Sequence, residues 1–484
     1  MDNGLTMKSL TTNSIFYLIY KSLNAIFPFF TGIYVTHVLL SDSIGEVEAA
    51  RNLAQYFVIL AYLGLPTYGL REISKVRKDR KELNKVYSEL MIINTLSTFV
   101  FLIMYLILVF SVDSYRNNLI LYLITGGSIA LNFFNNSWLF EGLEEFRYVS
   151  IRNIAFKVIS FVLLLLFVKK QSDYLIYALI TICGTAGNYL LNIINTHKYV
   201  SLIFSDLNLL RHMKSIFFLV AVNLAIEIYS LVDVTMLSNM AQYKNVAFYT
   251  YGQKVQKILI QIINSFTMVL VPRISLYYKE KRYNEFNDSI TKTLQAILLL
   301  SLPIIVGICF TSRYLLCEIY GDEYINSAYV LDILSFIIVI SPVGYLLGSR
   351  ALLVSGNEQK MIIPVGIGAI INVIGNYILI REYSEIGAAL ASLISESIIM
   401  IIYVSMGKKY LTLKKAALKN TALHILGSLL CMTIWLIACV LIIKSNLICT
   451  ITQIIGSVFI YFIILFIFKE QMVLLMINRI LKRR

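Results

Sequence analysis

Apolar stretches long enough to cross a lipid bilayer recur along almost the entire chain. A helix of about 20 apolar residues spans the hydrocarbon core, and we count roughly fourteen such stretches. Hydrophobic residues make up 58% of the 484 residues and charged residues only 14%, whereas soluble domains average about 25% charged residues. The runs lack the two-residue alternation of β-barrel strands. The sequence therefore predicts an all-α integral membrane protein with about 14 transmembrane helices.

The basic residues predict how these helices are oriented. Seven Lys and Arg residues lie between Arg71 and Lys85, after the second apolar stretch. Further basic groups lie near Lys281, near Lys408 and at the C-terminus. If the N-terminus is cytoplasmic, all of these segments fall on the cytoplasmic side, as the positive-inside rule requires, and both termini are inside. The formal net charge of +14 is then explained by topology, and we expect no nucleic-acid partner.

The sequence carries no signature of an enzyme, a metal site or a cofactor site. The six cysteines lack CxxC spacing, the four histidines form no HExxH pair, and no GxxxxGKS/T phosphate loop is present. His197 and His212 fall in an expected cytoplasmic loop, where we expect solvated side chains. The expected outward loops are all short and leave no room for an external catalytic domain. We therefore expect a non-enzymatic protein that needs neither metal nor cofactor.

A weak internal repeat predicts two lobes. Gly45–Arg51 is followed by Leu70–Ser74 in the same way as Lys244–Tyr251 is followed by Val271–Ser275. An offset of six spans preserves the orientation of the helices, which is typical of a parallel repeat. The expected parts are an N-terminal lobe of helices 1–6 (residues 1–205), a C-terminal lobe of helices 7–12 (206–410), and helices 13–14 with a basic tail (411–484).

Charged residues interrupt several of the apolar stretches. A charge at membrane depth costs several kcal/mol unless it faces water or a partner, so these residues predict a polar chamber inside the bundle. An arginine fork suits the oxygens of a diphosphate. The predicted lining cations are Lys21, Arg51, Lys254 and Lys257, and the predicted ion-coupling acids are Glu227 and Glu396.

Each of these charges also has a structural explanation. Arg51 can snorkel to the headgroups, and so can Lys157 in the fifth apolar stretch. Glu227 and Lys257 both lie near mid-membrane, where they form either a fixed buried ion pair or a pair that opens when Glu227 takes a coupling proton. Glu396 is either a second protonatable site or a neutral acid that is hydrogen-bonded within the bundle.

Seven segments in order resemble one transporter family. Trp138-Leu-Phe-Glu141-Gly142-Leu-Glu-Glu145-Phe146 resembles the W-x-F/Q-x-G-x-E-x-F/Y signature that follows the fourth span of bacterial lipid-linked polysaccharide flippases. The other matching segments are Leu63–Ile73, Asp233–Leu237 with Tyr249, Tyr320–Tyr324, Leu353–Asn357, Asn372–Asn376 and Ile386–Ala389. Over residues 10–405 the chain is similar to Wzx-type flippases of O-antigen or capsule repeat units, in the multidrug/oligosaccharidyl-lipid/polysaccharide superfamily. It departs from the family at Glu141, where many members carry Gln.

The resemblance implies a two-lobed bundle that opens alternately to each side of the bacterial inner (plasma) membrane. The implied cargo is an oligosaccharide linked through diphosphate to undecaprenol, moved from the inner to the outer leaflet. Membrane lipids, a polysaccharide polymerase and a chain-length regulator are the implied partners.

Two alternatives stay open. One is a cation-coupled multidrug exporter of the same superfamily, against which the in-span cations argue. The other is a membrane polysaccharide polymerase or ligase, against which the short outer loops argue.

Overall fold

Helices account for all the regular secondary structure of the described chain. The computed structural model describes residues 24, 26–268, 271–443 and 446–474, without the side chains of 218–228 and 266–272. Within these ranges nine helical segments are long and apolar enough to cross a bilayer, beside the shorter apolar helices Ile26–Thr36 and Leu119–Phe134. This confirms an all-helical membrane protein, while the expected total of about 14 spans stays a prediction.

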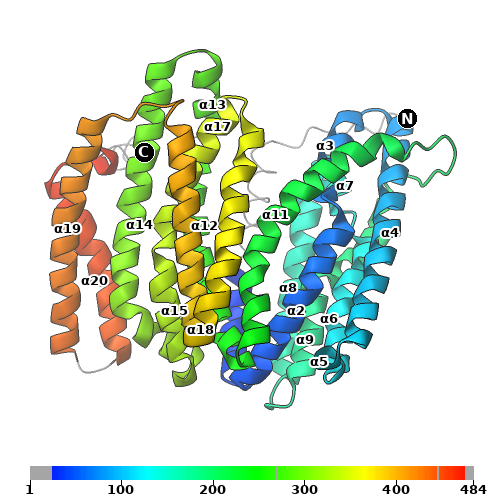
Figure 1. Cartoon of the computed structure of the whole chain (residues 1–484), viewed down its shortest axis with the longest axis horizontal. Helices are drawn as coiled ribbons and strands as arrows, with labels where there is room; N and C mark the ends of the chain where they lie inside the picture. Colours follow the sequence, from blue (N-terminus) through cyan, green and yellow to red (C-terminus); the bar gives the residue numbers. More distant parts are fainter. Residues whose placement is uncertain (1–23, 25, 269–270, 444–445, 475–484) are drawn as a thin grey trace. The chain divides into compact units, whose positions relative to one another are not determined.

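The chain divides into two compact units, Met1–Ala247 and Phe248–Arg484, which are here called the N-terminal and the C-terminal unit. The helices of the N-terminal unit are Ile26–Thr36, α2 (Ser41–Tyr62), α3 (Leu65–Val76), α4 (Arg80–Ser111), α5 (Asp113–Arg116), α6 (Leu119–Leu131), α7 (Ser137–Gly142), α8 (Phe146–Phe167), α9 (Tyr174–Thr185), α10 (Leu190–Thr196) and α11 (Leu210–Met240), with 3-10 turns η1 (Asn132–Phe134) and η2 (Gly187–Tyr189). Figure 1 labels most of them.

The boundary between the units lies at Ala247–Phe248, while the expected division into lobes after residue 205 stays a prediction. The helix α11, which was expected to open the C-terminal lobe, packs along α2. Asn52 of α2 donates hydrogen bonds to the carbonyl of Leu231 (3.1 Å) and to the hydroxyl of Thr235 (2.8 Å) on α11. By its contacts α11 thus belongs to the N-terminal unit. The assignment of six helices to each lobe stays a prediction.

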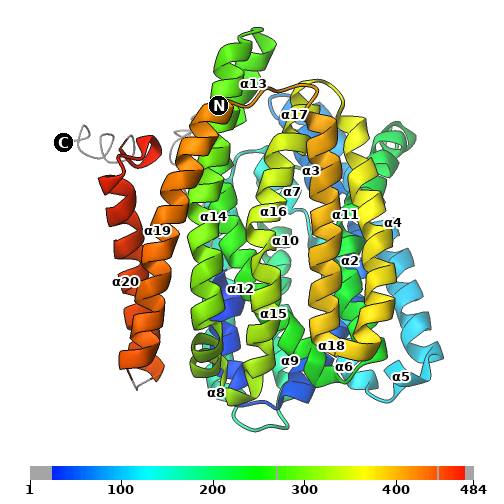
Figure 2. The ribbon, with the colours of Figure 1, turned by 60° about the vertical axis from the view of Figure 1, so that its left-hand side comes forward.

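The C-terminal unit begins within α12 (Tyr243–Met268). Its further helices are α13 (Val271–Lys279), α14 (Tyr283–Tyr320), α15 (Ile325–Ser335), α16 (Ile337–Gly344), α17 (Arg350–Val354), α18 (Ile362–Gly407), α19 (Lys415–Ile442) and α20 (Asn446–Ile467), with 3-10 turns η3 (Asp322–Tyr324) and η5 (Glu358–Met361) and the π turn η4 (Tyr345–Ser349). The segment α18 is in fact two helices that meet at Ser384, where φ is 47°. Figure 2 shows them side by side.

The last two helices form a hairpin against α14. α19 and α20 pack on each other and on α14, as the left side of Figure 1 shows. The hydroxyl of Tyr461 donates to the carbonyl of Leu299 (3.0 Å), and the amide of Gln295 donates to Thr421 (2.8 Å). Such interhelical hydrogen bonds stabilise packing where lipid provides no hydrophobic driving force. The hairpin is therefore fixed to the C-terminal unit through α14.

Two of the family-like segments, Leu63–Ile73 and the segment that begins at Trp138, pack against each other at one end of the N-terminal unit. This contact is here called the packing joint. Leu63 and Gly64 adopt left-handed conformations, with φ of 46° and 66°, and turn the chain from α2 into α3. Trp138 of α7 is 1% exposed and lies against Gly69 of α3, where an added Cβ would come within 2.8 Å of the indole ring. The resemblance at these positions thus reflects close packing of α3 on α7.

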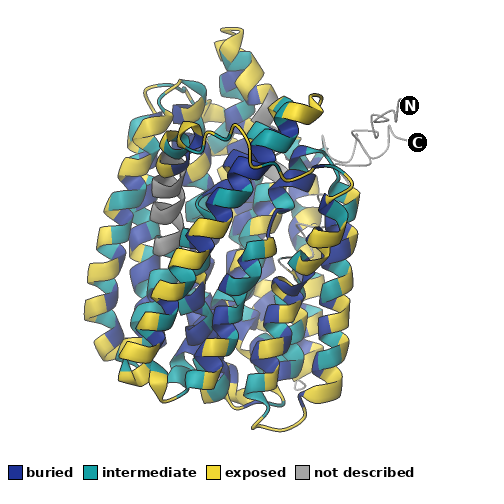
Figure 3. Ribbon diagram, turned by 90° about the vertical axis from the view of Figure 1, so that its right-hand side faces the viewer, coloured by how far each residue is buried: buried dark blue, intermediate teal, exposed yellow. Residues whose placement is uncertain are grey.

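The outer faces of the long helices are apolar and exposed. On α4 the exposed apolar side chains recur every three or four residues, which places them on one face; they are Leu96, Phe99, Val100, Ile103, Met104, Ile107 and Phe110. Figure 3 shows exposed and buried turns alternating along the helices on this side. A patch of this size on a soluble protein would drive association, so it fits a surface that contacts lipid.

We predict that Gly69→Ala lowers the melting temperature of the purified protein, whereas Gly127→Ala leaves it unchanged or raises it. Alanine is favoured over glycine in a helix by about 1 kcal/mol. Overpacking costs about 1–3 kcal/mol, and only Gly69 meets a buried indole, since a Cβ on Gly127 meets nothing within 4 Å. Thermal unfolding in one detergent, followed by tryptophan fluorescence, measures the difference. Equal melting temperatures for the two variants would contradict the proposed joint.

Candidate functional site

Two spans of the N-terminal unit are broken in their interior. The fourth span stops at the end of α6, passes through η1 and resumes as α7, and the sixth span is interrupted by η2 between α9 and α10. Backbone groups freed by such breaks need partners, because hydrocarbon offers none. Asparagine side chains supply them: at η1, Asn94 donates to the carbonyl of Asn132 (2.9 Å) and Asn192 to that of Phe134 (3.0 Å). At η2, Asn188 donates to the carbonyl of Thr185 (2.8 Å).

A buried network of amides and hydroxyls surrounds these breaks. Asn132 donates to Thr98 (2.9 Å), and Asn136 donates to Thr196 (2.7 Å) and to Tyr87 (3.2 Å). Arg152 of α8 lies at the edge of the network, where it contacts Asn192 and donates to Ser137 (3.1 Å). These side-chain hydrogen bonds connect α4, α8 and α10 to the broken segments.

Lys157 lies at the middle of α8 and is 7% exposed. Its ammonium group contacts the side-chain oxygen of Asn24 and lies 5.3 Å from the ring centroid of Phe27. Both partners precede or belong to the first described helix. The side chain therefore points into the N-terminal unit and does not snorkel to a membrane surface. The structure thus places a basic group between α8 and the first described helix, beside the partly buried side chains of Asn24 and Phe27. Lys21, which the sequence predicted to line a polar chamber, lies outside the described residues.

Arg51 lies at the middle of α2. Its guanidinium forms an ion pair with Glu48 one turn earlier (3.3 Å), and the two side chains are 31% and 10% exposed. One turn further along α2, the hydroxyl of Tyr56 hydrogen-bonds with that of Thr235 (3.0 Å). Arg51 is thus held laterally by Glu48 within a polar stripe of α2, with its guanidinium still partly accessible.

In the C-terminal unit, Lys254 lies over an aromatic ring. Its ammonium group is 4.1 Å from the ring centroid of Tyr251. The ring of Tyr251 packs in turn on Tyr320 (4.8 Å) and Tyr324 (5.3 Å), and all three tyrosines are fully buried. Tyr320 and Tyr324 come from the family-like motif between α14 and α15. This motif therefore forms the aromatic base on which Lys254 rests.

Lys257 and Glu396 lie on two helices of the C-terminal unit that meet through a hydroxyl pair. Tyr249 of α12 and Ser392 of α18 are 3.2 Å apart. Glu396 follows Ser392 by one helical turn and so lies on the same face of α18. Lys257 follows Tyr249 by two turns and lies on the same face of α12. The contact of Tyr249 with Ser392, here called the α12–α18 seam, thus lies one turn from Glu396 and about two turns from Lys257.

The structure groups the predicted residues only within each unit. Arg51 and Lys157 belong to the N-terminal unit, and Lys254, Lys257 and Glu396 to the C-terminal unit. Glu227 lies in α11, but its side chain is outside the described residues, so neither explanation of the Glu227–Lys257 relation is tested. In the described ranges no group of three or more His, Cys, Asp or Glu residues could hold a metal ion.

Sequence reasoning missed an ionic cluster that fixes the segment leading into α11. Glu89 of α4 has a fully buried side chain, which accepts hydrogen bonds from Arg211 (2.5 Å) and from the backbone of Asn208 (2.7 Å) and contacts His212 (2.8 Å). The other ring nitrogen of His212 contacts the hydroxyl of Tyr68 (2.8 Å). The expectation of a solvated His212 was wrong, since it is 3% exposed.

The residues before Glu89 on α4 anchor the same connecting segment. The side chains of Asn84 and Ser88 accept hydrogen bonds from the backbone amides of Ser201 (3.0 Å) and Ile203 (2.9 Å). Two backbone amides of a connecting segment without regular secondary structure thereby find hydrogen-bond acceptors on one face of α4. Two features of the sequence could have indicated this cluster. One is the carboxylate of Glu89 within a long, largely apolar helix, and the other is the pair Arg211 and His212 near the start of α11.

Comparison with known proteins identifies the family. The family described as "Polysaccharide biosynthesis protein" matches residues 10–278, which is more than half of the chain. The chain belongs to this family. A second family, described as "MatE", matches residues 219–378.

Two relatives that are similar to this chain are described as transporters. A candidate O-antigen transporter from Shigella dysenteriae is 23% identical over 387 residues, which cover 78% of this chain and 95% of the relative. The lipid II flippase MurJ of Bacillus subtilis is 28% identical over 187 residues, 36% of this chain and 34% of the relative. The family member is thus a membrane transporter of the polysaccharide flippase type and not an enzyme.

Solved structures confirm the fold. Lipid II flippase MurJ in an inward closed conformation has a TM-score of 0.75 at 17% identity and covers 96% of this chain and 100% of its own. A superfamily transporter from Pyrococcus furiosus has a TM-score of 0.56 at 15% identity, covering 82% of this chain and 94% of its own. At these identities the likeness concerns the fold alone.

We predict that Glu89→Ala destabilises the protein far more than Glu82→Ala. Both carboxylates form an ion pair with Arg211, Glu82 at 3.1 Å and Glu89 at 2.5 Å. The side chain of Glu89 is fully buried, whereas that of Glu82 is 39% exposed. Removing one partner of a buried pair costs about 3–5 kcal/mol, and the partial exposure of Arg211 reduces this to about 2–3 kcal/mol. An exposed pair contributes less than about 1 kcal/mol. Denaturant midpoints in a fixed detergent measure both losses, and similar losses would disprove the anchoring role of Glu89.

Proposed function

We propose that this protein moves oligosaccharide repeat units, linked through diphosphate to undecaprenol, from the inner to the outer leaflet of the bacterial plasma membrane by alternating access. The glycan then serves the synthesis of O-antigen or capsule. The observation that carries the proposal is the set of basic side chains inside membrane-spanning helices of a polysaccharide-family transporter. Lys157 supports it most directly, because its side chain is 7% exposed at the middle of α8, where its ammonium group contacts Asn24 and lies over the ring of Phe27.

The chemistry of the cargo explains why such cations are needed. A diphosphate cannot enter hydrocarbon without replacement of its water, and cationic donors replace it best. The prenyl tail can stay in lipid while the headgroup crosses. The cations proposed to bind the diphosphate are Arg51 and Lys157, with Lys21, in the N-terminal unit, and Lys254 and Lys257 in the C-terminal unit. Polar groups beside them, such as Asn52 and Gln253, are suited to bind sugar hydroxyls.

We predict that Arg51→Gln and Lys157→Gln each reduce surface glycan at least tenfold in a deletion strain complemented with the variant gene. The expected cause is weaker diphosphate binding during the crossing, because a hydrogen bond to a charged group contributes about 1.5–3 kcal/mol. Arg116→Gln is the matched control, since Arg116 pairs with Asp113 on the exposed helix α5 (3.4 Å). Surface glycan is quantified at equal membrane levels of each protein. Wild-type glycan from both interior variants would remove the proposed role of these cations.

We further propose that Glu227 and Glu396 couple transport to an ion gradient. No ATP-binding motif is present in the sequence, so the driving force comes from ions or from the membrane potential. The position of Glu396 supports this role. Ser392, one turn away on α18, has its hydroxyl 3.2 Å from that of Tyr249 on α12, and α12 also carries Lys254 and Lys257. Protonation of Glu396 would change the charge near the α12–α18 seam and thereby its preferred packing.

We predict that Glu396→Gln retains binding of the lipid-linked oligosaccharide but abolishes the dependence of its translocation on an imposed pH gradient in proteoliposomes. The glutamine is close in shape to a protonated glutamate but cannot change charge. Glu382→Gln is the control, because this exposed residue of α18 lies beside the kink at Ser384. An unchanged response to the gradient would assign Glu396 a structural role.

A multidrug exporter of the same superfamily is the second candidate function. The MatE match over residues 219–378 favours it. Transport of organic cations by the reconstituted protein, with no effect of lipid-linked oligosaccharide, would select this function over the flippase.

A further inference from the structure

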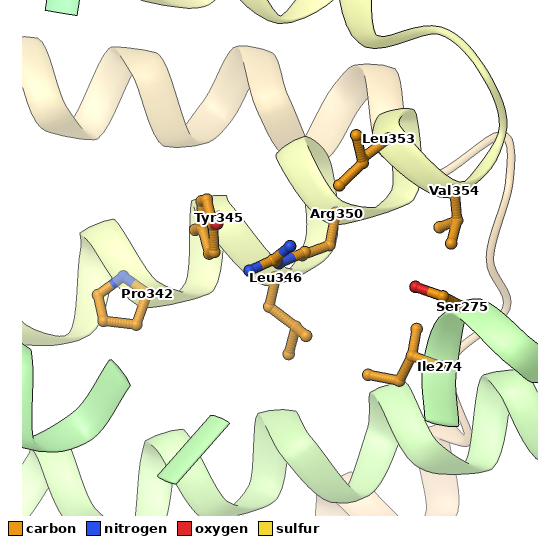
Figure 4. A pocket seen from close by; sticks show the side chains of 8 residues that line it. All are labelled: Ile274, Ser275, Pro342, Tyr345, Leu346, Arg350, Leu353 and Val354. Carbon is orange, nitrogen blue, oxygen red and sulfur yellow. The ribbon is translucent and has the colours of Figure 1, made fainter. Parts of the chain in front are cut away.

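A narrow pocket lies within the C-terminal unit, between α13 and the bent segment α16–η4–α17. It is a shallow depression rather than a large cavity, and its walls are mostly apolar, with Ile274, Pro342, Leu346, Leu353 and Val354 among them. Figure 4 shows these side chains around the guanidinium of Arg350, with Ser275 facing it from α13. The pocket lies beside the loop that contains Lys281, which the positive-inside pattern assigns to the cytoplasm.

Arg350 is the one charged residue in the lining of this pocket. Its Nε is buried and donates no hydrogen bond within the described residues, and its guanidinium lies over the ring of Tyr345, 4.6 Å from the centroid. Arg282 nearby differs, because Glu280 and Glu285 both pair with it (3.1 Å each). A buried donor without an acceptor is costly, so the pocket holds a guanidinium whose Nε has no acceptor among the described residues.

The backbone around Arg350 is fixed from the opposite side. The π turn η4 directly precedes Arg350, and such turns shift the phase of a helix and occur frequently at functional sites. Gly344 lies so close to α18 that an added Cβ would be 3.1 Å from the Cα of Met400. The hydroxyl of Tyr403 donates to the carbonyl of Met361 (2.9 Å). The segment therefore packs rigidly on α18 and presents Arg350 toward α13.

We propose that Arg350 binds the phosphate group of an anionic phospholipid from the cytoplasmic leaflet. The guanidinium fork matches phosphate oxygens, and the hydroxyl of Ser275 offers a further donor. Tyr345 and Leu353 are 44% and 41% exposed at the mouth, where acyl chains can cover them. A free phosphate ion would leave the apolar walls unused, so the lining favours a lipid. The basic residues Lys279 and Lys281 raise the local concentration of anionic headgroups.

The test uses the purified full-length protein in detergent and three probes: dioctanoyl phosphatidylglycerol, dioctanoyl phosphatidylcholine and inorganic phosphate. Native mass spectrometry measures binding. We expect saturable binding of phosphatidylglycerol, weaker binding of phosphatidylcholine, and a loss of about tenfold or more in phosphatidylglycerol affinity for Arg350→Gln. Arg381→Gln is the matched control, since Arg381 also lies over a tyrosine ring, that of Tyr377 (3.9 Å), outside the pocket lining.

Several outcomes would overturn the proposal. Equal affinity of wild type and Arg350→Gln removes Arg350 as the receptor, and equal binding of the two lipids removes the requirement for an anionic headgroup. Inorganic phosphate that displaces phosphatidylglycerol at similar concentration shows a free-anion site. If Arg350→Gln does not fold, Arg350→Lys keeps the charge without the fork, and an affinity equal to wild type then refutes bidentate binding. Because the probe is an ordinary phospholipid, the outcome is independent of whether the protein moves lipid-linked oligosaccharides.

Discussion

The structure depends on satisfying backbone groups where no water is available. A continuous helix does this by itself, but the fourth and sixth spans of the N-terminal unit are broken. At η1, Asn94 and Asn192 donate to the carbonyls of Asn132 and Phe134, and at η2, Asn188 donates to the carbonyl of Thr185. Irregular backbone at membrane depth is tolerated only where it is buried in protein or lines a cavity. The asparagine network therefore permits a polar interior in an otherwise apolar unit, and Arg152 contacts that interior through Asn192 and Ser137.

The same requirement explains the segment that leads into α11. Between α10 and α11 the chain has no helix to pair its amides, and Asn84, Ser88 and Glu89 of α4 accept hydrogen bonds from it. Glu89 then also pairs with Arg211, at the start of α11. A transporter that changes conformation needs connections that hold while lobes move. This segment is anchored on its N-terminal side by charge and hydrogen bonds, so the start of α11 is expected to move together with α4.

The sequence was sufficient for features that depend on composition and local spacing. Apolar length predicted the helical membrane class, and the segments Leu63–Ile73 and Trp138–Tyr148 predicted the family because tight packing of Gly69 on Trp138 restricts them. Features set by tertiary contacts were not predictable. The burial of His212 depends on Glu89 and Tyr68, which are distant in sequence, and the place of α11 depends on its hydrogen bonds with Asn52. The proposed role of Arg350 could not be predicted from the sequence, because it depends on the pocket that α13 and the segment α16–η4–α17 form around it.

The fold by itself does not decide the cargo. A solved structure of a multidrug resistance transporter of the superfamily shares it with a TM-score of 0.54, and the Pyrococcus furiosus protein is described as having a binding pocket of reversed polarity that suggests a different function. Function in this superfamily must therefore be argued from the charge of a few side chains inside the spans. A cavity that accepts organic cations needs net negative charge. Here Lys157 is buried, Lys254 rests on an aromatic ring, and Arg51 remains partly accessible beside Glu48. Basic groups retained at such cost fit an anionic headgroup better than a cationic drug.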